Sequence, residues 1–521
     1  MAVLLAAPVA ARAGVSAGPP AERLVAPVAG EFHFEGHGFG HGRGMSQWGA
    51  QGAASHGIDH KTILSTYYPG TDLVRSDEIP EIRVHLSGLG SDALRVVAGP
   101  GMQLLTIGRT TALPRQLDDQ KVTDWRVRSV DGALQLEGLT DGWHRVGPRS
   151  AAGDPVELRG GDDDLQVVRG QELRQYRGAL RVFPGDRDGQ VAVVNVVDIE
   201  SYLRSVVPSE SPAYFEPAAL QAQAVAARTY ALWHATHASA DAVSDICDTT
   251  ACQVYRGVRT LHRQGGTDRR WENSRTDAAV ADTAGEQLNY DGKPALTEFS
   301  DSNGGWSTAG NEPYLPSRPD PWDGLVPNHS HSWTYTLNAA RLQQAWPQIG
   351  RPTGLAAAQR DGDGAWGGRV LSVRVVGDHG QVVVPGGKFD HAAGMRNSWW
   401  QLEVDPSSLP TEIPTAPPAT DAPSAAPPAS PQPAAPAQPA APAVAPPASA
   451  QPAAPAQPTA PAQSAIPAQP GAPAQPAAPA ATGGQGRAAP AVPTAAQPTS
   501  PQQPAATDQD GPDGGDPAVN R

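Results

Sequence analysis

The sequence predicts an α+β protein, in which helical and β-rich subdomains form one folded unit that is followed by a disordered tail. Three observations lead to this prediction. Short segments of alternating apolar and polar residues, separated by Gly, Asp and Pro, recur between residues 82 and 197 and are typical of strands. The alanine-rich segment 216–232 has high helix propensity. From about Thr411 the chain consists mainly of Pro, Ala and Gln, a composition that cannot bury enough apolar surface to offset its chain entropy.

These observations divide the chain into four segments. Residues 1–29 are interpreted as a truncated signal peptide and leader, because a short apolar run precedes Ala11-Arg12-Ala13, a sequence compatible with cleavage. No basic residue precedes that run, so the alternative that it is not a signal stays open. Residues 30–75 form a Gly/His-rich segment with short helices. Residues 76–405 form the main domain, mainly β at first and helical at 198–290, and residues 406–521 form the tail.

The charge of the chain limits the classes of partner. The 521 residues carry a formal net charge of −14, which argues against a nucleic acid as the main partner. No stretch after the leader is long and apolar enough to span a membrane. An acidic protein can still bind a neutral or zwitterionic polymer such as a glycan. If the leader is a signal peptide, the protein is secreted.

The residue pattern places the individual elements along the chain. Helices are expected at residues 45–56, 61–68, 198–207, 216–232 and 276–287. Strands are expected at residues 82–86, 94–97, 125–130, 134–136, 180–183 and 191–197. Asp198 is of the residue type that caps a helix N-terminus, and Asp291-Gly292 is a typical hairpin turn.

Glu210 differs from the other carboxylates in its surroundings. It is predicted to lie on a turn bracketed by Pro208 and Pro212, directly after the apolar residues Val206 and Val207. Most glutamates are exposed surface residues, and that is the ordinary interpretation here as well. If the apolar neighbours bury this carboxyl, its pKa rises toward neutrality, as a general acid requires.

Two cysteines and a run of alternating glycines are the other unusual features. Cys247 and Cys252 are separated by four residues and are interpreted as a disulfide that closes a short loop. Free thiols, or half of a metal site with His234 and His237, stay open as alternatives. Every second residue from Gly36 to Gly44 is glycine, which permits close approach to a backbone or a ligand. The run lacks the lysine of a nucleotide-binding loop.

Four separated islands of sequence carry a resemblance to a known family. Residues 206–210, 219–231, 247–255 and 302–305 resemble the SpoIID/LytB domain, and residues 40–47 resemble a further motif of that family. The resemblance covers roughly residues 30–405. Two departures accompany it: the Gly/His motif opens the chain instead of closing the domain, and Ser211 replaces the methionine that usually follows the glutamate. The first departure suggests a permuted domain or a site completed from both ends.

The resemblance implies action on bacterial peptidoglycan without a cofactor or a bound metal. Sporulation members of the family are lytic transglycosylases, which cleave the β-1,4 bond after N-acetylmuramic acid and prefer strands stripped of peptides. Glu210 matches their catalytic glutamate, and Arg228 matches an arginine needed for activity. The substrate-binding residues implied by the matched motifs are Arg228, His41, Ser46, Gln47, Asp248, Gln253, Tyr255, Gly304 and Gly305. For Ser46, Gln47, Gln253 and Tyr255, a structural hydrogen bond or core contact is an equal alternative.

Three functions therefore remain in view. The first is a secreted, sporulation-related lytic transglycosylase whose partner is the glycan strand; it needs one carboxyl group, because the sugar's own 6-hydroxyl replaces water as the nucleophile. The second is a non-catalytic cell-wall protein that activates an N-acetylmuramoyl-L-alanine amidase, as LytB-type members are regarded. The third is an unrelated metal hydrolase built on His37, His41 and the cysteines.

Overall fold

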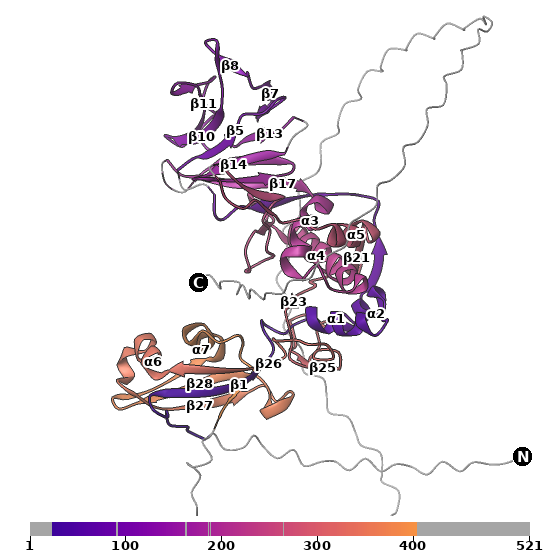
Figure 1. Cartoon of the computed structure of the whole chain (residues 1–521), viewed down its shortest axis with the longest axis vertical. Helices are drawn as coiled ribbons and strands as arrows, with labels where there is room; N and C mark the ends of the chain where they lie inside the picture. The colour runs from indigo at the N-terminus through magenta and orange to yellow at the C-terminus, as the bar shows by residue number, and fades with distance from the viewer. Residues whose placement is uncertain are drawn as a thin grey trace, which may run out of the picture. The chain divides into compact units, whose positions relative to one another are not determined.

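A computed structural model describes residues 23–403, except residues 90, 91, 162, 163, 186, 188 and 264. The predicted tail from residue 406 and most of the predicted leader lie outside these residues. The described residues all belong to the first of two contact units, Met1–Pro417; the second, Pro418–Arg521, is not described. Helices and strands are both abundant in the described part (Figure 1), which confirms the α+β class.

Two antiparallel sheets make up the β-rich part. The first has the strand order β12 (Trp143–Arg145), β11 (Ala133–Leu139), β10 (Asp124–Val130), β5 (Leu94–Val97), β14 (Leu165–Arg169), β15 (Glu172–Tyr176), β19 (Arg259–His262) and β20 (Arg269–Arg270). The second has the order β18 (Ile246–Cys247), β4 (Glu81–His85), β17 (Val191–Asp198), β16 (Ala179–Pro184), β13 (Val156–Arg159), β6 (Gln103–Thr106) and β7 (Arg109–Ala112), with β18 parallel to β4. Strands β8 (Gln116–Leu117) and β9 (Gln120–Lys121) form a small separate pair. All six predicted strands are present.

The alternation of residues explains why these sheets bury a common core. In β4, Ile82 and Val84 are buried while their neighbours are exposed or half-buried. In β10, Trp125, Val127 and Ser129 are buried, whereas Arg126, Arg128 and Val130 are exposed or half-buried. Side chains of a strand point alternately to its two faces, so one face of each sheet supplies apolar groups. Residues of helix α3 (Ile199–Glu210) complete this core, so this helix is fixed to the sheets that precede it in the chain.

The helical part is organised around α4 (Pro217–His237). Helix α4 contacts α1 (Gln47–Ser55), α2 (His60–Tyr67), α3 (Ile199–Glu210) and α5 (Ser274–Asp282), as well as strand β21 (Figure 1). Its buried residues are mostly alanines, for example Ala222, Ala224 and Ala226. Small side chains let four helices approach one helix closely, and alanine keeps the helix propensity high.

Short sheets border the helices. Strand β21 (Glu286–Tyr290) lies between β22 (Lys293–Pro294) and β3 (Asp72–Arg75). The predicted hairpin turn joins β21 to β22, with positive φ angles at Asp291 and Gly292. Strand β2 (Met45–Ser46) pairs in parallel with β23 (Phe299–Ser300), and β24 (Trp306–Ser307) pairs with β25 (Arg318–Pro319).

A third group of elements combines the start and the end of the described chain. Strand β1 (Glu31–His37) lies between β26 (Ser332–Asn338) and β30 (Trp400–Leu402). A second sheet contains β27 (Pro352–Arg360), β28 (Val370–Gly377) and β29 (Gly380–Pro385). Helices α6 (Ala339–Ala345) and α7 (Gly386–Ala393) and two 3-10 helices, η1 (Pro347–Ile349) and η2 (Ala365–Gly367), complete the group. Phe32, Phe34 and Trp400 lie in its core.

Two predicted boundaries need correction. Glu210 does not lie on a turn, because α3 continues through Pro208 to Glu210. The proline occurs in the last helical turn, and the Ser209 hydroxyl donates to the Ser205 carbonyl oxygen, at 2.7 Å, across that turn. The predicted helix 276–287 ends at Asp282, because Glu286 begins strand β21, which pairs with β3. Among the described residues, no helix combines the length and the apolar character needed to cross a membrane.

Candidate active site

Glu210 lines an open cleft at the C-terminal end of α3. The cleft has a volume of about 560 Å³, and the side chains or backbone of eighteen residues from six parts of the chain line it. Asp198 caps the start of α3 through a 2.8 Å hydrogen bond from the Ser201 N–H. Val206 and Val207 are fully buried in the preceding turn. The helix is therefore anchored at one end and in its middle, and it presents Glu210 at its other end.

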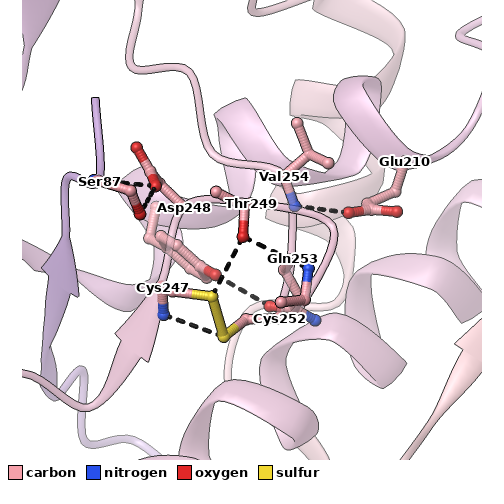
Figure 2. The surroundings of a disulfide bond; sticks show 10 residues. Ser87, Glu210, Cys247, Asp248, Thr249, Cys252, Gln253 and Val254 are labelled. Atoms are coloured by element: carbon pink, nitrogen blue, oxygen red, sulfur yellow. Dashed lines mark hydrogen bonds between the residues drawn. A yellow bond between two sulfur atoms is a disulfide. The ribbon is translucent and has the colours of Figure 1, made fainter. Parts of the chain in front are cut away.

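The surroundings of Glu210 favour its protonated form. Burial raises the pKa of the Glu210 carboxyl to about 7, against the opposing effects of the Val254 N–H, Gln47 and Arg256. The Val254 N–H donates to Oε1 at 2.6 Å (Figure 2). The Gln47 amide lies near enough to lower this pKa, although its nitrogen makes no hydrogen bond of ordinary geometry with the described residues. The helix C-terminus also disfavours a negative charge. Such a carboxyl can donate a proton near neutral pH.

The Gly/His segment forms the opposite part of the cleft lining. His41 and Gln47 line it together with Phe39, Gly40 and Arg43. Strand β2 holds this segment against β23, and the Phe39 N–H donates to the Ser302 carbonyl oxygen at 2.8 Å. The predicted motif and the predicted glutamate, more than 160 residues apart in the chain, thus share one site. The cleft is thus completed by residues that precede the matched glutamate region in the sequence and by residues that follow it.

Glycine is required in this segment because other backbone atoms approach it. Gly44 has a φ of +64°, and a Cβ atom there would overlap the Glu298 carbonyl group. Gly42 has a φ of +73°, and a Cβ would overlap the Arg369 guanidinium. Both angles also disfavour a side chain. The alternating glycines therefore allow the loop to pack onto residues 298–303 instead of binding a phosphate.

His41 has its ring in the cleft, and its Nδ1 accepts a hydrogen bond from the Arg43 N–H at 3.0 Å. The open cleft leaves the side chain exposed, yet protein atoms crowd it, and this desolvation together with the Arg43 guanidinium lowers the pKa of His41 below its usual range. At neutral pH the ring is uncharged, and its proton is on Nε2. His41 can therefore take part in hydrogen bonding without adding a positive charge next to Glu210.

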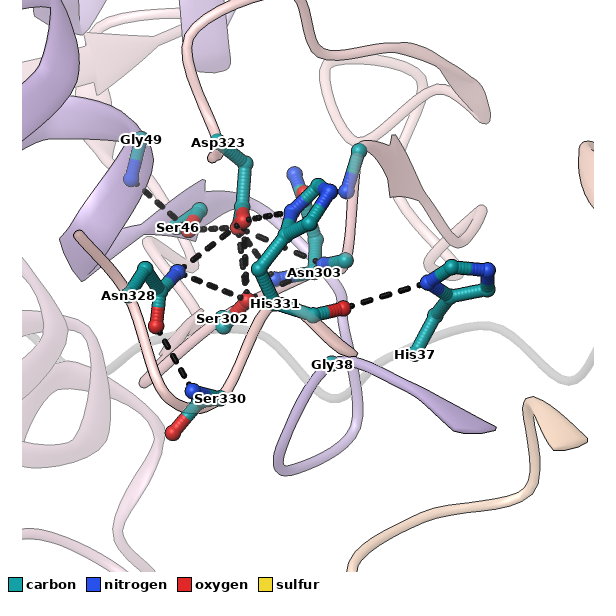
Figure 3. A network of polar contacts seen from close by, with 12 residues as sticks. His37, Gly38, Ser46, Gly49, Ser302, Asn303, Asp323, Asn328, Ser330 and His331 are labelled. Atoms are coloured by element: carbon teal, nitrogen blue, oxygen red, sulfur yellow. Dashed lines mark hydrogen bonds and ion pairs between the residues drawn. The ribbon is translucent and has the colours of Figure 1, made fainter. Parts of the chain in front are cut away.

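Ser46, Gly304 and Gly305 serve a buried network beside the cleft instead of lining it. The carboxylate of Asp323 accepts hydrogen bonds from the Ser46 hydroxyl at 2.7 Å, the Ser302 hydroxyl at 2.8 Å and the Gly304 N–H at 3.3 Å (Figure 3). Its other oxygen is 2.8 Å from Nδ1 of His331. Burial alone would raise the pKa of Asp323, but the bonds from His331, Ser46 and Ser302 together lower it.

This network joins the N-terminal segment to residues 302–305. Ser46 also caps α1, because its Oγ accepts the Gly49 N–H at 3.0 Å. Gly304 has a φ of +72°, and a Cβ there would lie 2.7 Å from the Gly38 nitrogen. The Gly305 N–H donates to the Asn303 side chain at 2.9 Å. These contacts position both walls of the cleft, and Ser46, Gly304 and Gly305 are not among the residues that line it.

Arg228 lies outside the cleft, in the core of the helical part. Its side chain is only 1% exposed. It donates from Nε and Nη2 to the two carboxylate oxygens of Glu200, at 2.8 and 2.7 Å, and from Nη1 to the Glu286 carbonyl oxygen at 3.0 Å. With its donors engaged by the protein, Arg228 holds α3, α4 and the start of β21 together. Direct contact with a glycan does not follow from this placement.

The segment around the two cysteines forms another wall. Cys247 and Cys252 are joined by a disulfide, and Cys252, Thr250 and Ala251 line the cleft (Figure 2). Asp248 instead accepts hydrogen bonds from the Ser87 N–H and hydroxyl, at 3.1 and 2.7 Å. The short loop is thereby tied to the end of β4, and the chain that follows is directed to Val254, whose N–H reaches Glu210.

Gln253 and Tyr255 point into the core. Gln253 accepts a hydrogen bond from the Tyr202 hydroxyl at 2.9 Å, and the Tyr255 hydroxyl donates to Asn195 at 2.6 Å. Both side chains are buried. Burial raises the pKa of Tyr255 above its usual range. Gln253 and Tyr255 therefore make structural hydrogen bonds and core contacts, the alternative to substrate binding given above. Because side chains alternate along this segment, only the Val254 backbone and Arg256 lie on the cleft side.

Several residues that line the cleft were not among the site residues predicted from the sequence. Arg43 donates to both oxygens of Glu298, at 2.8 and 2.6 Å, and this pair lines the cleft. Burial would raise the pKa of Glu298, but the hydrogen bonds from Arg43 lower it overall, so this carboxylate is ionised. Asp301 is a further carboxyl in the cleft, and its burial raises its pKa. Only the β2–β23 pairing brings these groups to Glu210.

Arg256 is the cation whose charge lowers the pKa of Glu210. Its guanidinium lies 4.5 Å from the centre of the Trp271 ring, within the range of a cation–π contact. Its side chain donates none of the hydrogen bonds found among the described residues, and it is exposed in the cleft. An arginine in this state can bind an anionic group. As for metals, no group of three or more His, Cys, Asp or Glu side chains in the described part of the chain is arranged to hold an ion.

Comparison with known proteins identifies the family. Residues 187–290 match the SpoIID family model, described as stage II sporulation protein. This match includes α3 with Glu210, α4 with Arg228, and the disulfide loop, so the chain contains a domain of the SpoIID family. The resemblance seen in the sequence is thereby confirmed. The Gly/His segment that completes the cleft lies outside the matched residues.

Individual relatives also match a part of the chain. Over 162 residues, the chain is 36% identical to the stage II sporulation protein D of Bacillus subtilis (strain 168), covering 29% of this chain and 46% of that protein. It is 33% identical over 169 residues to the amidase enhancer of the same organism, covering 31% and 21%. It is 34% identical over 155 residues to the stage II sporulation protein D of Bacillus amyloliquefaciens, covering 28% and 44%. The chain thus spans less than half the length of each of these relatives.

Proposed function

We propose that this protein is a lytic transglycosylase that cleaves peptidoglycan glycan strands, with Glu210 as its single acid and base. The observation that supports this most is the position of Glu210: an oriented carboxyl in an open cleft, with a pKa of about 7. A group with this pKa is protonated in a large fraction of molecules at neutral pH and can also act as a base once it has lost its proton. The resemblance to the SpoIID/LytB family implies the same substrate.

The reaction needs two proton transfers through this carboxyl. Glu210 first donates its proton to the glycosidic oxygen, and the bond between that oxygen and C1 of N-acetylmuramic acid breaks. The carboxylate then accepts the proton of the 6-hydroxyl, whose oxygen bonds to C1 and forms the 1,6-anhydro ring. No water is consumed, and Glu210 ends protonated as it began. Because the Val254 N–H holds Oε1, Oε2 is the oxygen that carries the proton.

The lining of the cleft suits a sugar polymer. Its volume of about 560 Å³ falls in the range of small-molecule sites, and its open form admits a chain. Phe39, Tyr230 and Phe299 offer aromatic faces among polar groups. The free guanidinium of Arg256 suits the lactyl carboxylate of N-acetylmuramic acid, which is exposed once the peptide has been removed. These features favour a peptide-free strand as the substrate.

A second candidate rests on one comparison. The relative from B. subtilis named amidase enhancer is 33% identical over 169 residues. In this alternative the protein binds the cell wall and activates an N-acetylmuramoyl-L-alanine amidase without cleaving sugars itself. In either case we propose that the protein is secreted and acts at the cell wall.

The deciding experiment is mass spectrometry of peptidoglycan digests. The wild type and Glu210→Gln are incubated with peptide-bearing and peptide-free glycan, each with and without a purified amidase. Anhydro-muramyl ends from the wild type alone support the transglycosylase. Reducing sugar ends would instead indicate hydrolysis, with water activated by a second carboxyl such as Asp301. Faster peptide release without any sugar cleavage would support the amidase activator.

A further inference from the structure

A second aromatic and polar pocket lies outside the region matched by the family. It is open, with a volume of about 520 Å³, and is lined by Glu35, Gly36, His37, Ser332, Trp333, Thr334 and Trp366. In the antiparallel register, Glu35 pairs with Thr334 and His37 pairs with Ser332. Directly paired residues share a face of a sheet. These four side chains therefore form a polar row on the face of β1 and β26 opposite the buried Phe32 and Phe34.

Trp366 is fixed over this row in an unusual backbone conformation. Its φ is +58° and its ψ is 17°, a left-handed conformation that is strained for a bulky residue. Its ring stacks on the His37 ring, with centroids 4.5 Å apart and planes inclined by 23°. The side chain is half-buried, and its indole N–H makes none of the hydrogen bonds found among the described residues. The pocket lining therefore includes the indole ring, whose N–H has no hydrogen-bond partner among the described residues.

The loop that carries Trp366 is held rigidly on both sides. Asp361 accepts hydrogen bonds at Oδ1 from the backbone N–H groups of Arg369 and Asp363, at 2.9 and 3.1 Å. The Asp363 carboxylate accepts the Ser317 hydroxyl at 2.5 Å. The Trp399 indole N–H donates to the Ala365 carbonyl oxygen at 3.0 Å. A loop this well anchored can maintain a strained residue, which is typical of a ligand-binding position.

A hydrogen bond to the backbone also fixes the orientation of His37. Its Nδ1 lies 3.2 Å from the His331 carbonyl oxygen (Figure 3), so in the uncharged ring this nitrogen donates and Nε2 is left as an acceptor. The pocket therefore offers a flat indole, an N–H donor, an imidazole acceptor, a carboxylate and two hydroxyls. Hydroxyls and an amide around an apolar ring face are the groups that an N-acetylhexosamine presents, so this set matches an amino sugar.

We infer that this pocket is a second binding subsite for the glycan strand, in which a sugar ring packs on Trp366. The choice of a glycan as ligand rests on the proposed function. One chain segment lines both sites, since His37 of the pocket lies four residues before His41 of the cleft, a span of at most about 14 Å. In the inferred arrangement, a strand bound beside Glu210 extends to the pocket over a few sugar rings. This subsite selects long strands and keeps them bound between cleavage events.

Trp366→Gly separates binding from folding. Glycine adopts the left-handed conformation without strain, so this change removes the indole while it keeps or raises thermal stability. The matched control is Trp143→Ala, which removes a half-buried tryptophan that stacks on Arg126 in the first β-sheet. Both changes are made in the Glu210→Gln protein, so that strands remain intact during the measurement.

The test is calorimetric titration with peptide-free peptidoglycan strands of eight or more sugars. We expect Trp366→Gly to raise the Kd about tenfold, the loss of one stacked ring, and Trp143→Ala to leave it unchanged. An unchanged Kd in Trp366→Gly, an equal loss in Trp143→Ala, or no binding by the Glu210→Gln parent overturns the inference. The digests of the wild type decide the proposed function separately. If the protein binds glycan through Trp366 but cleaves none, the inferred subsite stands and the proposed transglycosylase activity does not.

Discussion

The two ends of helix α3 each carry a glutamate, and their surroundings are opposite. At the first turn, Glu200 accepts two hydrogen bonds from Arg228 and one from the Gly285 N–H, at 3.2 Å. At the last turn, Glu210 accepts one short backbone hydrogen bond and faces an open cleft. A helix favours negative charge at its N-terminus and disfavours it at its C-terminus. The hydrogen-bonding capacity of the Glu200 carboxylate is therefore satisfied and its role is structural, whereas the Glu210 carboxyl retains a proton that it can donate.

This comparison also separates the two residues that the family resemblance treats together. Glu210 and Arg228 both match positions needed for activity, but the structure places only Glu210 in the cleft. Arg228 supports α3 from within the core, through the glutamate at the other end of the helix. We therefore propose that Arg228 is a positioning residue, which acts on the site by fixing the helix that carries Glu210.

The largest expected effect is on catalysis and distinguishes the two glutamates directly. Glu210→Gln should lower the rate of glycan cleavage by about a thousandfold, because general acid–base catalysis contributes that order of magnitude. Glu200→Gln should retain most of the activity, since its side chain does not reach the cleft, but should lower stability by about 1–2 kcal/mol. Release of anhydro-muramyl products over time measures the first effect. Equal losses of activity in two folded variants would remove the distinction.

Arg228→Ala should cause the largest loss of stability. It leaves the Glu200 carboxylate without its partner inside the protein, which costs about 3 kcal/mol. Urea unfolding followed by circular dichroism gives the change in the free energy of unfolding. Arg228→Lys serves as the companion variant, because it keeps the charge but not the paired hydrogen bonds. A stable Arg228→Ala protein without activity would show that Arg228 acts at the site after all.

A smaller effect is expected from the network that joins the cleft walls. In Asp323→Asn, an amide nitrogen replaces an oxygen that accepts hydrogen bonds from Ser46, Ser302 and Gly304. At least one buried donor then loses its acceptor, at a cost of about 2 kcal/mol. Asp141→Asn, at an exposed carboxylate, is the control and should leave the unfolding curve nearly unchanged. Equal unfolding curves for the two variants would contradict the role given to Asp323.

The smallest expected effect is a pH-dependent difference in stability, which tests the protonation state of Glu210. The pKa of this carboxyl in the folded protein, about 7, lies above its ordinary value of 4.5. Its contribution to stability is therefore fully present below about pH 4.5 and is lost as the pH rises through 7. Glu210→Gln does not titrate, so it should match the wild type at pH 4 and exceed it at pH 8. Because the cleft is open to water, we expect a gain of only about 1–2 kcal/mol. A difference that does not change with pH would show that the carboxyl is already ionised.

Local residue patterns predict most of the elements but little of the site. Alternation in segments such as 125–130 gives the strands, Asp198 marks the start of α3, and alanine content gives α4. Glu210 and the Gly/His segment were each recognisable, yet their contact depends on a two-residue parallel pairing and on Asp323, for which no sequence signal exists. Gln253 and Tyr255 match family motifs but face the core. Trp366 lies in a glycine-rich loop whose left-handed conformation no periodicity reveals.

The positions along the chain of the segments that form the cleft walls also affect when the site can form during synthesis. One wall comes from residues 39–47, another from residues 250–256, and the contacts that join them to the rest come from residues 298–331. Pairings this distant in sequence form late and fold slowly. A chain released by the ribosome before Asp323 carries Glu210 but has no fixed opposite wall. Under the proposed function, a nascent fragment that ends before Asp323 thus lacks the complete cleft, which forms only when most of the folded part has been made.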